Sequence, residues 1–270
     1  MANIKFSSFT TETNPANVDF LVGYEGTTMK KIDPANVSGA AYPFLIDTLS
    51  LYSGFVPTGL SGNPQGNTIL GIDAGKLLAG GNSNTLVGSQ AGRFITSGIC
   101  NVVIGENAGI NVSTQSFNVV IGREAGASGT AVASTTIGRL AGLSGNYSIS
   151  IGDQASRFAN GADNIFIGEQ AGYSSQGGDG VIGIGKSASR QNTANYTTSI
   201  GYNAGYSQTS GVGNTNVGYE AGYTATTGGD NSFLGYQTGK YITGNDNTAI
   251  GREAMIGTST ASNEHCNLKQ

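Results

Sequence analysis

Residues 67–75 read Asn-Thr-Ile-Leu-Gly-Ile-Asp-Ala-Gly, and residues 84–92 read Asn-Thr-Leu-Val-Gly-Ser-Gln-Ala-Gly. This pattern recurs through residue 256, and each copy contains one glycine, here called the anchor, that follows Ile, Leu or Val. The residue three positions after the anchor is Ala in eleven copies and Thr238 in the remaining one. The twelve anchors stand 14 to 17 residues apart, at Gly71, Gly88, Gly105, Gly122, Gly138, Gly152, Gly168, Gly185, Gly201, Gly218, Gly235 and Gly251.

Each copy can be interpreted as a short strand followed by a corner. Residues three and one before an anchor, such as Thr68 and Leu70, share one face of a strand, and their β-branched or aliphatic side chains suit a buried face. We therefore expect these positions, including Ile121, to point into the core. The anchor permits a positive φ or a close backbone approach at the corner. The Asn that opens most copies is expected to form hydrogen-bond ladders between layers.

This spacing predicts an all-β chain, with each copy forming one coil of a parallel β-solenoid. A helical alternative is disfavoured, because each recurring Gly would cost about 1 kcal/mol in a helix. Coils of 14–17 residues are expected to form a flattened roll, and about twelve of them stack over residues 67–256.

The residue between the two expected core positions suggests a second buried surface. It is apolar in the first four copies, beginning with Ile69, and polar in several later ones, such as Ser150 and Asn216. Apolar residues on both faces of the early strands, together with a thin core, favour association with a partner chain. Identical copies arranged about an axis are the simplest partner.

Composition excludes several classes of function. Only 11 % of the residues are charged, and 13 basic against 17 acidic residues give a net charge of −4. No basic stripe is present, so nucleic acid is not an expected partner. No apolar run approaches the roughly 18 residues that a membrane span requires, so no membrane insertion is expected. His265 is the only histidine, and Cys100 and Cys266 lie far apart, so no metal or cofactor site is expected.

The motif Asn-Thr-x-Ile-Gly-x-x-Ala-Gly resembles the head repeat of trimeric autotransporter adhesins, the YadA-like left-handed parallel β-roll. It is more closely similar to the Asn-Thr-x-Ile-Gly-Tyr-x-Ala-Gly repeat of bacteriophage tail fibres and virion appendages, which is seen here at 214–222 and 198–205. The resemblance covers residues 67–256. It implies a left-handed roll and a homotrimer of three rolls side by side, in which each chain closes its neighbours' exposed flank.

The sequence divides into four segments. Residues 1–45 are expected to form an attachment segment, with a β-hairpin around Glu25-Gly26 and a short helix from Asp33 to Val37. Residues 46–66 are expected to form an apolar transition that joins three chains. The β-roll of residues 67–256 follows, and residues 257–270 are expected to cap it or to form a tail.

The sequence gives only weak indications of catalytic residues. Residues 180–187 match the P-loop pattern, but that chemistry needs a helix after the loop, whereas Gly185 is a repeat anchor. Several carboxylates stand one or two residues after an anchor and could form the acid/base pair of a glycosidase: Asp73, Glu106, Glu124, Asp153, Glu169, Glu220 and Glu253. Basic residues occupy the same repeat positions, as expected for a solvated edge of mixed charge. We therefore predict no catalytic residues and no enzymatic activity.

Tyrosines form the more informative cluster. Tyr202, Tyr219 and Tyr236 each follow an anchor, and Tyr173, Tyr206 and Tyr223 each follow an Ala-Gly corner. Coil stacking predicts two parallel aromatic ladders. They are candidate contacts for a host glycan or receptor, but their packing on each other or on a neighbouring protomer is the favoured interpretation.

The expected function is that of a structural fibre or spike component located in a phage virion. Its N-terminal segment would bind other virion proteins, and its roll would project outward and contribute to host attachment. A bacterial trimeric adhesin head is the alternative, disfavoured because the N-terminus lacks a signal-peptide pattern. An ice-binding solenoid is a third reading, but its threonine array is interrupted too often, as at Val102 and Ile149.

Overall fold

A computed structural model describes the backbone of residues 22–25, 28–31, 45–47 and 50–53, and residues 65–127, 131–142, 145–257, 260 and 262–267. The chain divides into two compact units, residues 1–41 and residues 42–270. Most of the described residues belong to the second unit.

The first unit contains a β-hairpin. Strand β1 (Val22–Glu25) pairs antiparallel with β2 (Thr28–Lys31), and Glu25 lies opposite Thr28. The hairpin predicted around Glu25-Gly26 is therefore confirmed. The short helix predicted from Asp33 lies outside the described residues.

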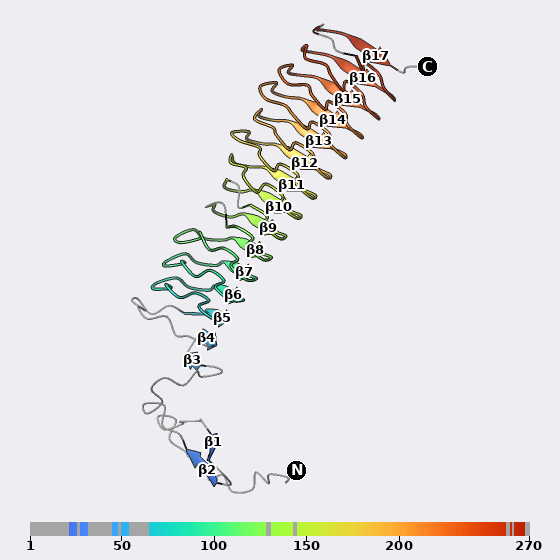
Figure 1. Cartoon of the computed structure of the whole chain (residues 1–270). Helices are drawn as coiled ribbons and strands as arrows, with labels where there is room; N and C mark the ends of the chain where they lie inside the picture. Colours follow the sequence, from blue (N-terminus) through green and yellow to red (C-terminus); the bar gives the residue numbers. More distant parts are fainter. Residues whose placement is uncertain are drawn as a thin grey trace. The chain divides into compact units, whose positions relative to one another are not determined.

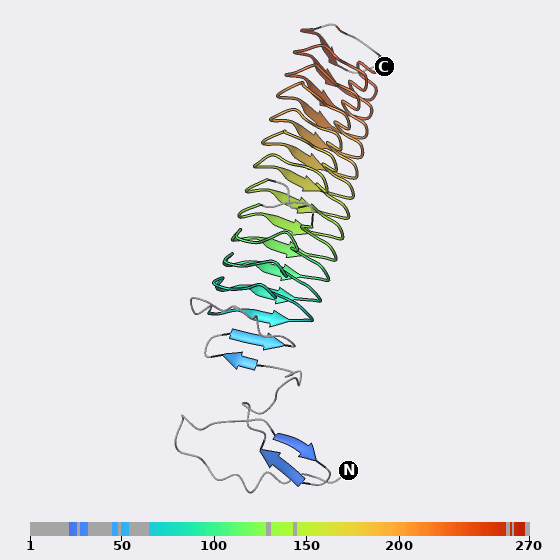
Figure 2. The same ribbon diagram turned by 60° about the vertical axis from the view of Figure 1, so that its left-hand side comes forward.

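The second unit is built on one sheet of 15 strands that lie in chain order from β3 to β17 (Figures 1 and 2). β3 is antiparallel to β4, and every later pairing is parallel. The sheet extends beyond the repeat, through β3 (Leu45–Asp47) and β4 (Ser50–Ser53) at one end and β17 (His265–Asn267) at the other. The repeat strands are β5 (Thr68–Leu70), β6 (Thr85–Val87), β7 (Val102–Ile104), β8 (Val119–Ile121), β9 (Thr135–Ile137), β10 (Ile149–Ile151), β11 (Ile165–Ile167), β12 (Ile182–Ile184), β13 (Thr198–Ile200), β14 (Thr215–Val217), β15 (Ser232–Leu234) and β16 (Thr248–Ile250).

This arrangement confirms the predicted parallel β-solenoid. Each repeat strand has three residues and ends directly before an anchor, and the twelve anchors delimit eleven turns. The described residues contain no helix, and the rest of each coil consists of turns and bends. Strands pair residue for residue with the next coil, so equivalent residues of successive copies form straight columns, as in Val102 opposite Val119.

The anchor glycines form the most restrictive of these columns. Their φ angles lie between 120° and 141°, a region that only glycine occupies readily. A Cβ atom on Gly88 would lie 2.6 Å from the carbonyl oxygen of Gly105 in the next coil. The amide of every anchor from Gly88 to Gly251 also donates to the coil before it, as in the 2.8 Å bond from Gly105 N to the Val87 carbonyl. Glycine is therefore required both for the backbone conformation and for the approach of the layers.

The predicted asparagine ladder is present inside the coils. The Oδ1 atom of Asn84 accepts hydrogen bonds from the backbone N and the Nδ2 of Asn101, at 3.0 and 3.1 Å. Asn118 repeats both bonds on Asn101, and all three side chains are fully buried. Ser134 and Ser148 continue the column with hydroxyl groups in place of amides. The ladder satisfies backbone N–H groups that have no strand partner.

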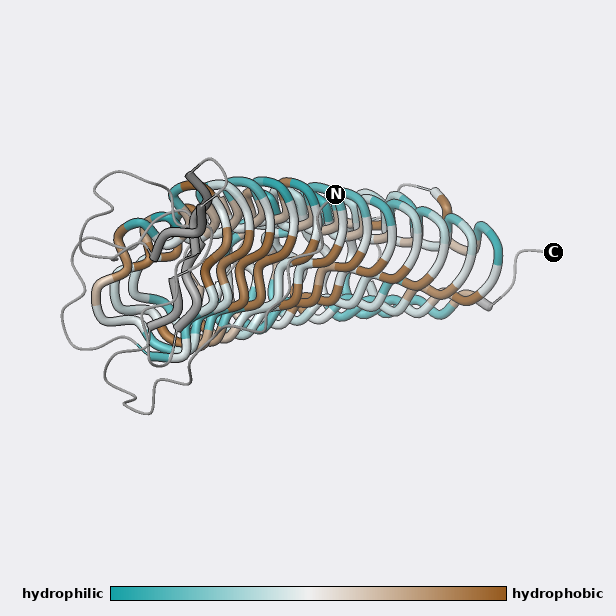
Figure 3. Tube along the Cα trace, turned by 90° about the horizontal axis from the view of Figure 1, so that it is seen from below, coloured by the Kyte–Doolittle hydropathy of each residue, from teal (hydrophilic) through white to brown (hydrophobic). Residues whose placement is uncertain are grey.

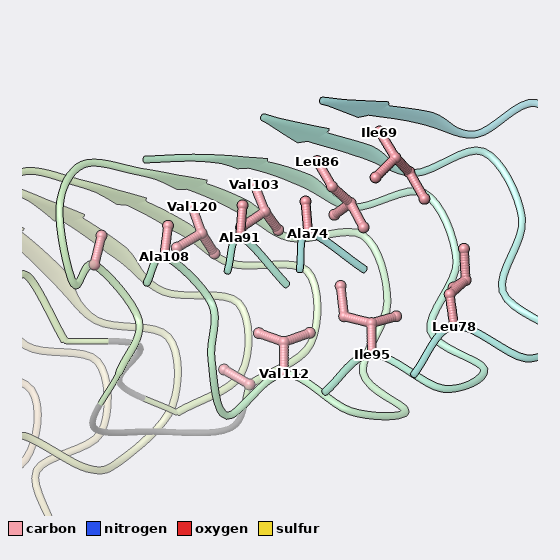
Figure 4. Close-up of a cluster of buried hydrophobic side chains, with 12 residues drawn as sticks. Ile69, Ala74, Leu78, Leu86, Ala91, Ile95, Val103, Ala108, Val112 and Val120 are labelled. Atoms are coloured by element: carbon pink, nitrogen blue, oxygen red, sulfur yellow. The ribbon is translucent and has the colours of Figure 1, made fainter. Parts of the chain in front are cut away.

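The core lies on the opposite face of the strands from the one that we expected. The middle residue of every repeat strand is buried, and Ile69, Leu86 and Val103 pack there with the motif alanines (Figure 4). The residues on either side, including Ile121, are only half-buried or are exposed. The expectation that these flanking positions form the core is wrong. Because the chain turns inward at both ends of a three-residue strand, the central side chain faces the enclosed space and its neighbours face outward.

Replacing Gly105 by Ala should destabilise the solenoid by about 2 kcal/mol or more, because the new Cβ meets the Gly122 carbonyl and the φ of 133° is strained. Chemical denaturation measures the loss. Gly257→Ala is the matched control, since no atom lies within 4 Å of its Cβ position. Equal losses in the two variants would contradict the stacking role of the anchors.

Candidate functional site

The outer face of the sheet carries a continuous apolar row, here called the aliphatic row. It consists of the residue before each anchor. Figure 3 shows that hydrophobic residues recur at the same place from coil to coil. Several members are strongly exposed, among them Leu70 at 41 % and Leu234 at 50 %. The members are Leu70, Val87, Ile104, Ile121, Ile137, Ile151, Ile167, Ile184, Ile200, Val217, Leu234 and Ile250.

In two of the middle coils, those of β10 and β12, the strand is more apolar on its outer face than on its inner face. Ile149 and Ile151 flank the buried Ser150, and Ile182 and Ile184 flank the buried Gly183. A soluble strand with one exposed face normally has the reverse pattern, with polar side chains on the outside. Apolar side chains on an exposed face are typical of a surface that another chain covers.

The first predicted aromatic ladder is present and is here called the tyrosine ladder. Tyr202 stacks on Tyr219 with ring centroids 5.3 Å apart, and Tyr219 stacks on Tyr236 at 4.9 Å, in both cases with nearly parallel planes. The Arg252 guanidinium lies 5.2 Å from the centre of the Tyr236 ring. The ring of Tyr219 is thus covered on both faces by its neighbours. The three side chains remain 40–44 % exposed. Tyr219 and Tyr236 therefore present their edges to a ligand, whereas Tyr202 is stacked on one face, against Tyr219.

The second predicted ladder contains two cations that sequence reasoning missed. Tyr206 stacks on Tyr223 at 5.0 Å, but the Arg190 guanidinium separates Tyr206 from Tyr173, at 5.6 and 4.9 Å from the two ring centres. Lys240 lies 5.7 Å from the centre of the Tyr223 ring. Arg190 and Lys240 both stand five residues after an anchor, as do these tyrosines, so a comparison of equivalent repeat positions would have identified them.

The carboxylates after the anchors take part in ion pairs. Three pairs join the same repeat position of adjacent coils, in the column that the tyrosine ladder continues. Each carboxylate has a cation within 4 Å, which gives the edge the predicted mixed charge and favours an inter-coil role over acid/base chemistry. The pairs are Asp73–Lys76, Glu106–Arg123, Glu124–Arg123, Asp153–Arg139, Glu169–Lys186, Glu220–Lys240 and Glu253–Arg252.

The P-loop match at residues 180–187 has a different structural context from a phosphate-binding loop. Ile182–Ile184 forms β12, and the chain then enters a turn at Gly185, as it does after every other repeat strand. No helix follows this loop in the described chain, so the helix N-terminus that would cradle a phosphate is not formed.

Glu220 is the centre of the most buried ionic cluster on the surface. Its side chain is 14 % exposed and accepts from the Nζ of Lys240 at 2.5 Å and from the Nε2 of Gln237 at 2.8 Å. Burial by itself would raise the pKa of Glu220, but these hydrogen bonds together outweigh it and hold the pKa below its usual value. The hydrogen bond to Glu220 raises the pKa of Lys240. The cluster therefore links two adjacent coils through a charged pair.

Comparisons with known proteins give no match, since no protein-family model, curated protein or solved structure is significantly similar to this chain. Among the described residues, no three His, Cys, Asp or Glu side chains gather as metal ligands would. The same part of the chain holds no helix long and apolar enough to cross a membrane. The aliphatic row and the two ladders are thus the surface features from which function can be argued.

The pair of Glu220 and Lys240 should make stability depend on pH. Because the pKa of Glu220 is lowered in the folded state, Glu220 contributes to the free energy of unfolding above its unfolded pKa. This contribution is lost as the pH falls through the folded pKa. Because the folded pKa of Lys240 is raised, its contribution is lost as pH rises through that value. Glu220→Gln should lower stability at pH 7 by about 1 kcal/mol and should reduce the loss on acidification.

Thermal melts of wild type and Glu220→Gln between pH 7 and pH 3 measure this effect. The control is Glu169→Gln, because Glu169 and Lys186 form a similar pair at 3.0 Å that is about half exposed. The control should change the melting temperature less at every pH. An equal response of the two variants would contradict the role of burial in the Glu220 cluster.

Proposed function

We propose that this chain is a structural fibre or spike component of a phage virion that acts as a homotrimer. In this proposal, residues 1–45 bind other virion proteins, and the solenoid projects outward and contributes to attachment to a host-surface glycan. Support comes from the parallel solenoid, from the resemblance of its repeat to those of phage appendages, and above all from the aliphatic row. A bacterial adhesin head would share this architecture and remains the alternative.

The aliphatic row is the observation that carries the proposed self-association. It places an Ile, Leu or Val on the outer face of all twelve repeat strands, in register along the sheet. Burial of apolar surface contributes roughly 25 cal/mol per Å², so a row of this length has a strong tendency to be covered. Each chain offers one such face, and closed cyclic symmetry lets identical faces cover one another about an axis without leaving an open end.

The tyrosine ladder supports the attachment role through its open edges. Both faces of Tyr219 and Tyr236 and one face of Tyr202 are covered, so sugar rings would meet mainly the hydroxyl groups and edges of these tyrosines. Tyrosine hydroxyls are donors and acceptors that suit sugar hydroxyls. Three copies of the ladder in a trimer would raise the avidity for a surface that displays many glycans.

Ile167→Asp should dissociate the oligomer while leaving the solenoid of each chain folded, because an unpaired charge would be buried between protomers and not within a coil. Sedimentation equilibrium gives the mass, and circular dichroism gives the fold. Ile72→Asp is the matched control, since Ile72 is 76 % exposed at the corner and lies outside the aliphatic row. Wild-type protein that sediments as a folded 27.4 kDa monomer would refute the proposed assembly.

Replacing Tyr202, Tyr219 and Tyr236 together by Phe should lower glycan binding severalfold with little change in melting temperature. Phenylalanine preserves the stack and removes the hydroxyl groups. A glycan array measures binding, and the same change at Tyr206 and Tyr223, which are half-buried, is the control. Unchanged glycan binding by the triple variant would leave the ladder with a structural role only.

Antibodies against the solenoid that label bacterial surfaces and not phage particles would favour the adhesin alternative.

A further inference from the structure

The interior of the solenoid is not apolar throughout. One buried apolar cluster runs from Ile69 to Ala131 (Figure 4), a small one surrounds Phe166, and another extends from Ala221 to Ala254. The coils between Val181 and Ala221 contribute no residue to any of these clusters. Their inward positions carry polar side chains instead, at Ser189, Asn192, Ser199, Gln208 and Asn216.

Four of these side chains have polar atoms without a partner in the chain: Ser189, in the coil before, and Ser199, Gln208 and Asn216, which lie in two adjacent coils. Ser199, Gln208 and Asn216 are each 0 % exposed. Neither amide atom of Gln208, neither amide atom of Asn216, nor the hydroxyl of Ser199 has a hydrogen-bond partner. Buried polar groups in folded proteins are almost always hydrogen-bonded, to protein or to ordered water. A water molecule inside the coils would supply the missing partners.

Ser199 and Asn216 lie in register in adjacent coils, and Gln208 occupies the repeat position of Ile95, which lies with Leu86 beside Gly92 in an early coil. β13 and β14 pair Ser199 directly with Asn216 in the next layer. The Oγ of Ser199 lies against Gly205, and a Cβ atom built on that glycine would lie 3.2 Å from the Nδ2 of Asn216, whose Oδ1 lies against Gly222 of its own coil. Gln208 follows in the same coil as Ser199 and Gly205.

The inward side chains of these coils are smaller than the aliphatic ones that fill the early coils. Ser199 and Asn216 lie two residues before their anchors, the repeat position that Leu86 occupies in an early coil. Gln208 lies seven residues after its anchor, the position that Ile95 occupies in the same early coil. In the layer of Asn216, Ala225 replaces a branched aliphatic side chain at the second position. The in-register strands and the stacked anchors keep the layers aligned, so the smaller side chains fill less of the enclosed space. A water molecule occupies about 30 Å³ of liquid volume.

The chemistry of the orphaned atoms identifies the guest. Two amide nitrogens donate, two amide oxygens accept, and one hydroxyl can do either. No Asp, Glu, Lys or Arg is among the buried residues of the described chain, so no charge there would balance an ion. Water provides donors and acceptors at once. We propose that the coils of β13 and β14 bind ordered internal water between Ser199, Gln208 and Asn216.

Oxygen-17 magnetic relaxation dispersion of the intact protein in H₂¹⁷O tests this proposal. Long-lived internal water produces an excess relaxation, which should fall by at least half in Gln208→Met, a substitution that keeps the side chain's length and removes its hydrogen-bonding atoms. Gln191→Met is the matched control, because Gln191 lies exposed in the preceding coil and should leave the excess unchanged. Asn216→Val provides a second variant should Gln208→Met fail to fold.

A crystal structure distinguishes the remaining outcomes. Ordered solvent density within hydrogen-bonding distance of the Gln208 and Asn216 amides is expected. Direct amide–amide hydrogen bonds with no solvent between them would overturn the proposal. An anomalous signal at this position from bromide or rubidium would also overturn it, because the guest would then be an ion. Equal excess oxygen-17 relaxation in wild type, Gln208→Met and Asn216→Val would also overturn the proposal.

Discussion

The stacking of glycine on glycine at the corner of each coil is the constraint on which the rest of the structure depends. An anchor φ between 120° and 141° turns the chain out of the strand, and the missing Cβ lets the next layer's carbonyl approach. This contact aligns the coils residue for residue, so the residues at each of the remaining repeat positions also form a column. The asparagine ladder, the ion-pair column and the tyrosine ladder are all consequences of that alignment.

The distribution of apolar residues between the inside and the outside of the coils supports the proposed assembly. A coil of 14–17 residues encloses little space, and the motif Ala at its second corner keeps that space small. In the coils of β10 and β12, Ser150 and Gly183 occupy the interior while isoleucines lie outside. Such coils derive little stability from their own core. In the proposed trimer, the neighbouring copies would complete the hydrophobic burial that a single chain lacks.

The repeat made much of the structure predictable. Coil length, the parallel stack, the asparagine ladder and the stacked tyrosines all follow from which residues recur at which spacing, and the structure contains each of them. The direction of the strand side chains was predicted incorrectly, because alternation states only that neighbours point to opposite faces. Which face is enclosed depends on how the corners turn, and that is a property of the folded coil. The position of Arg190 between two tyrosines and the ion pair of Lys240 with Glu220 were also not predicted, because both contacts depend on how the side chains lie along the stacked coils.

The sequence by itself determined that this chain forms in-register layers, because a glycine at every corner and an aliphatic residue before it recur twelve times. Tertiary structure alone decided that those aliphatic residues lie outside and that polar residues such as Gln208 lie inside. The physical reason is that periodicity specifies relative position along a strand, whereas burial depends on the closure of the backbone around one face. That closure comes from four positive-φ corners in a typical coil, several of them occupied by residues other than glycine, such as Gln90 and Ser83.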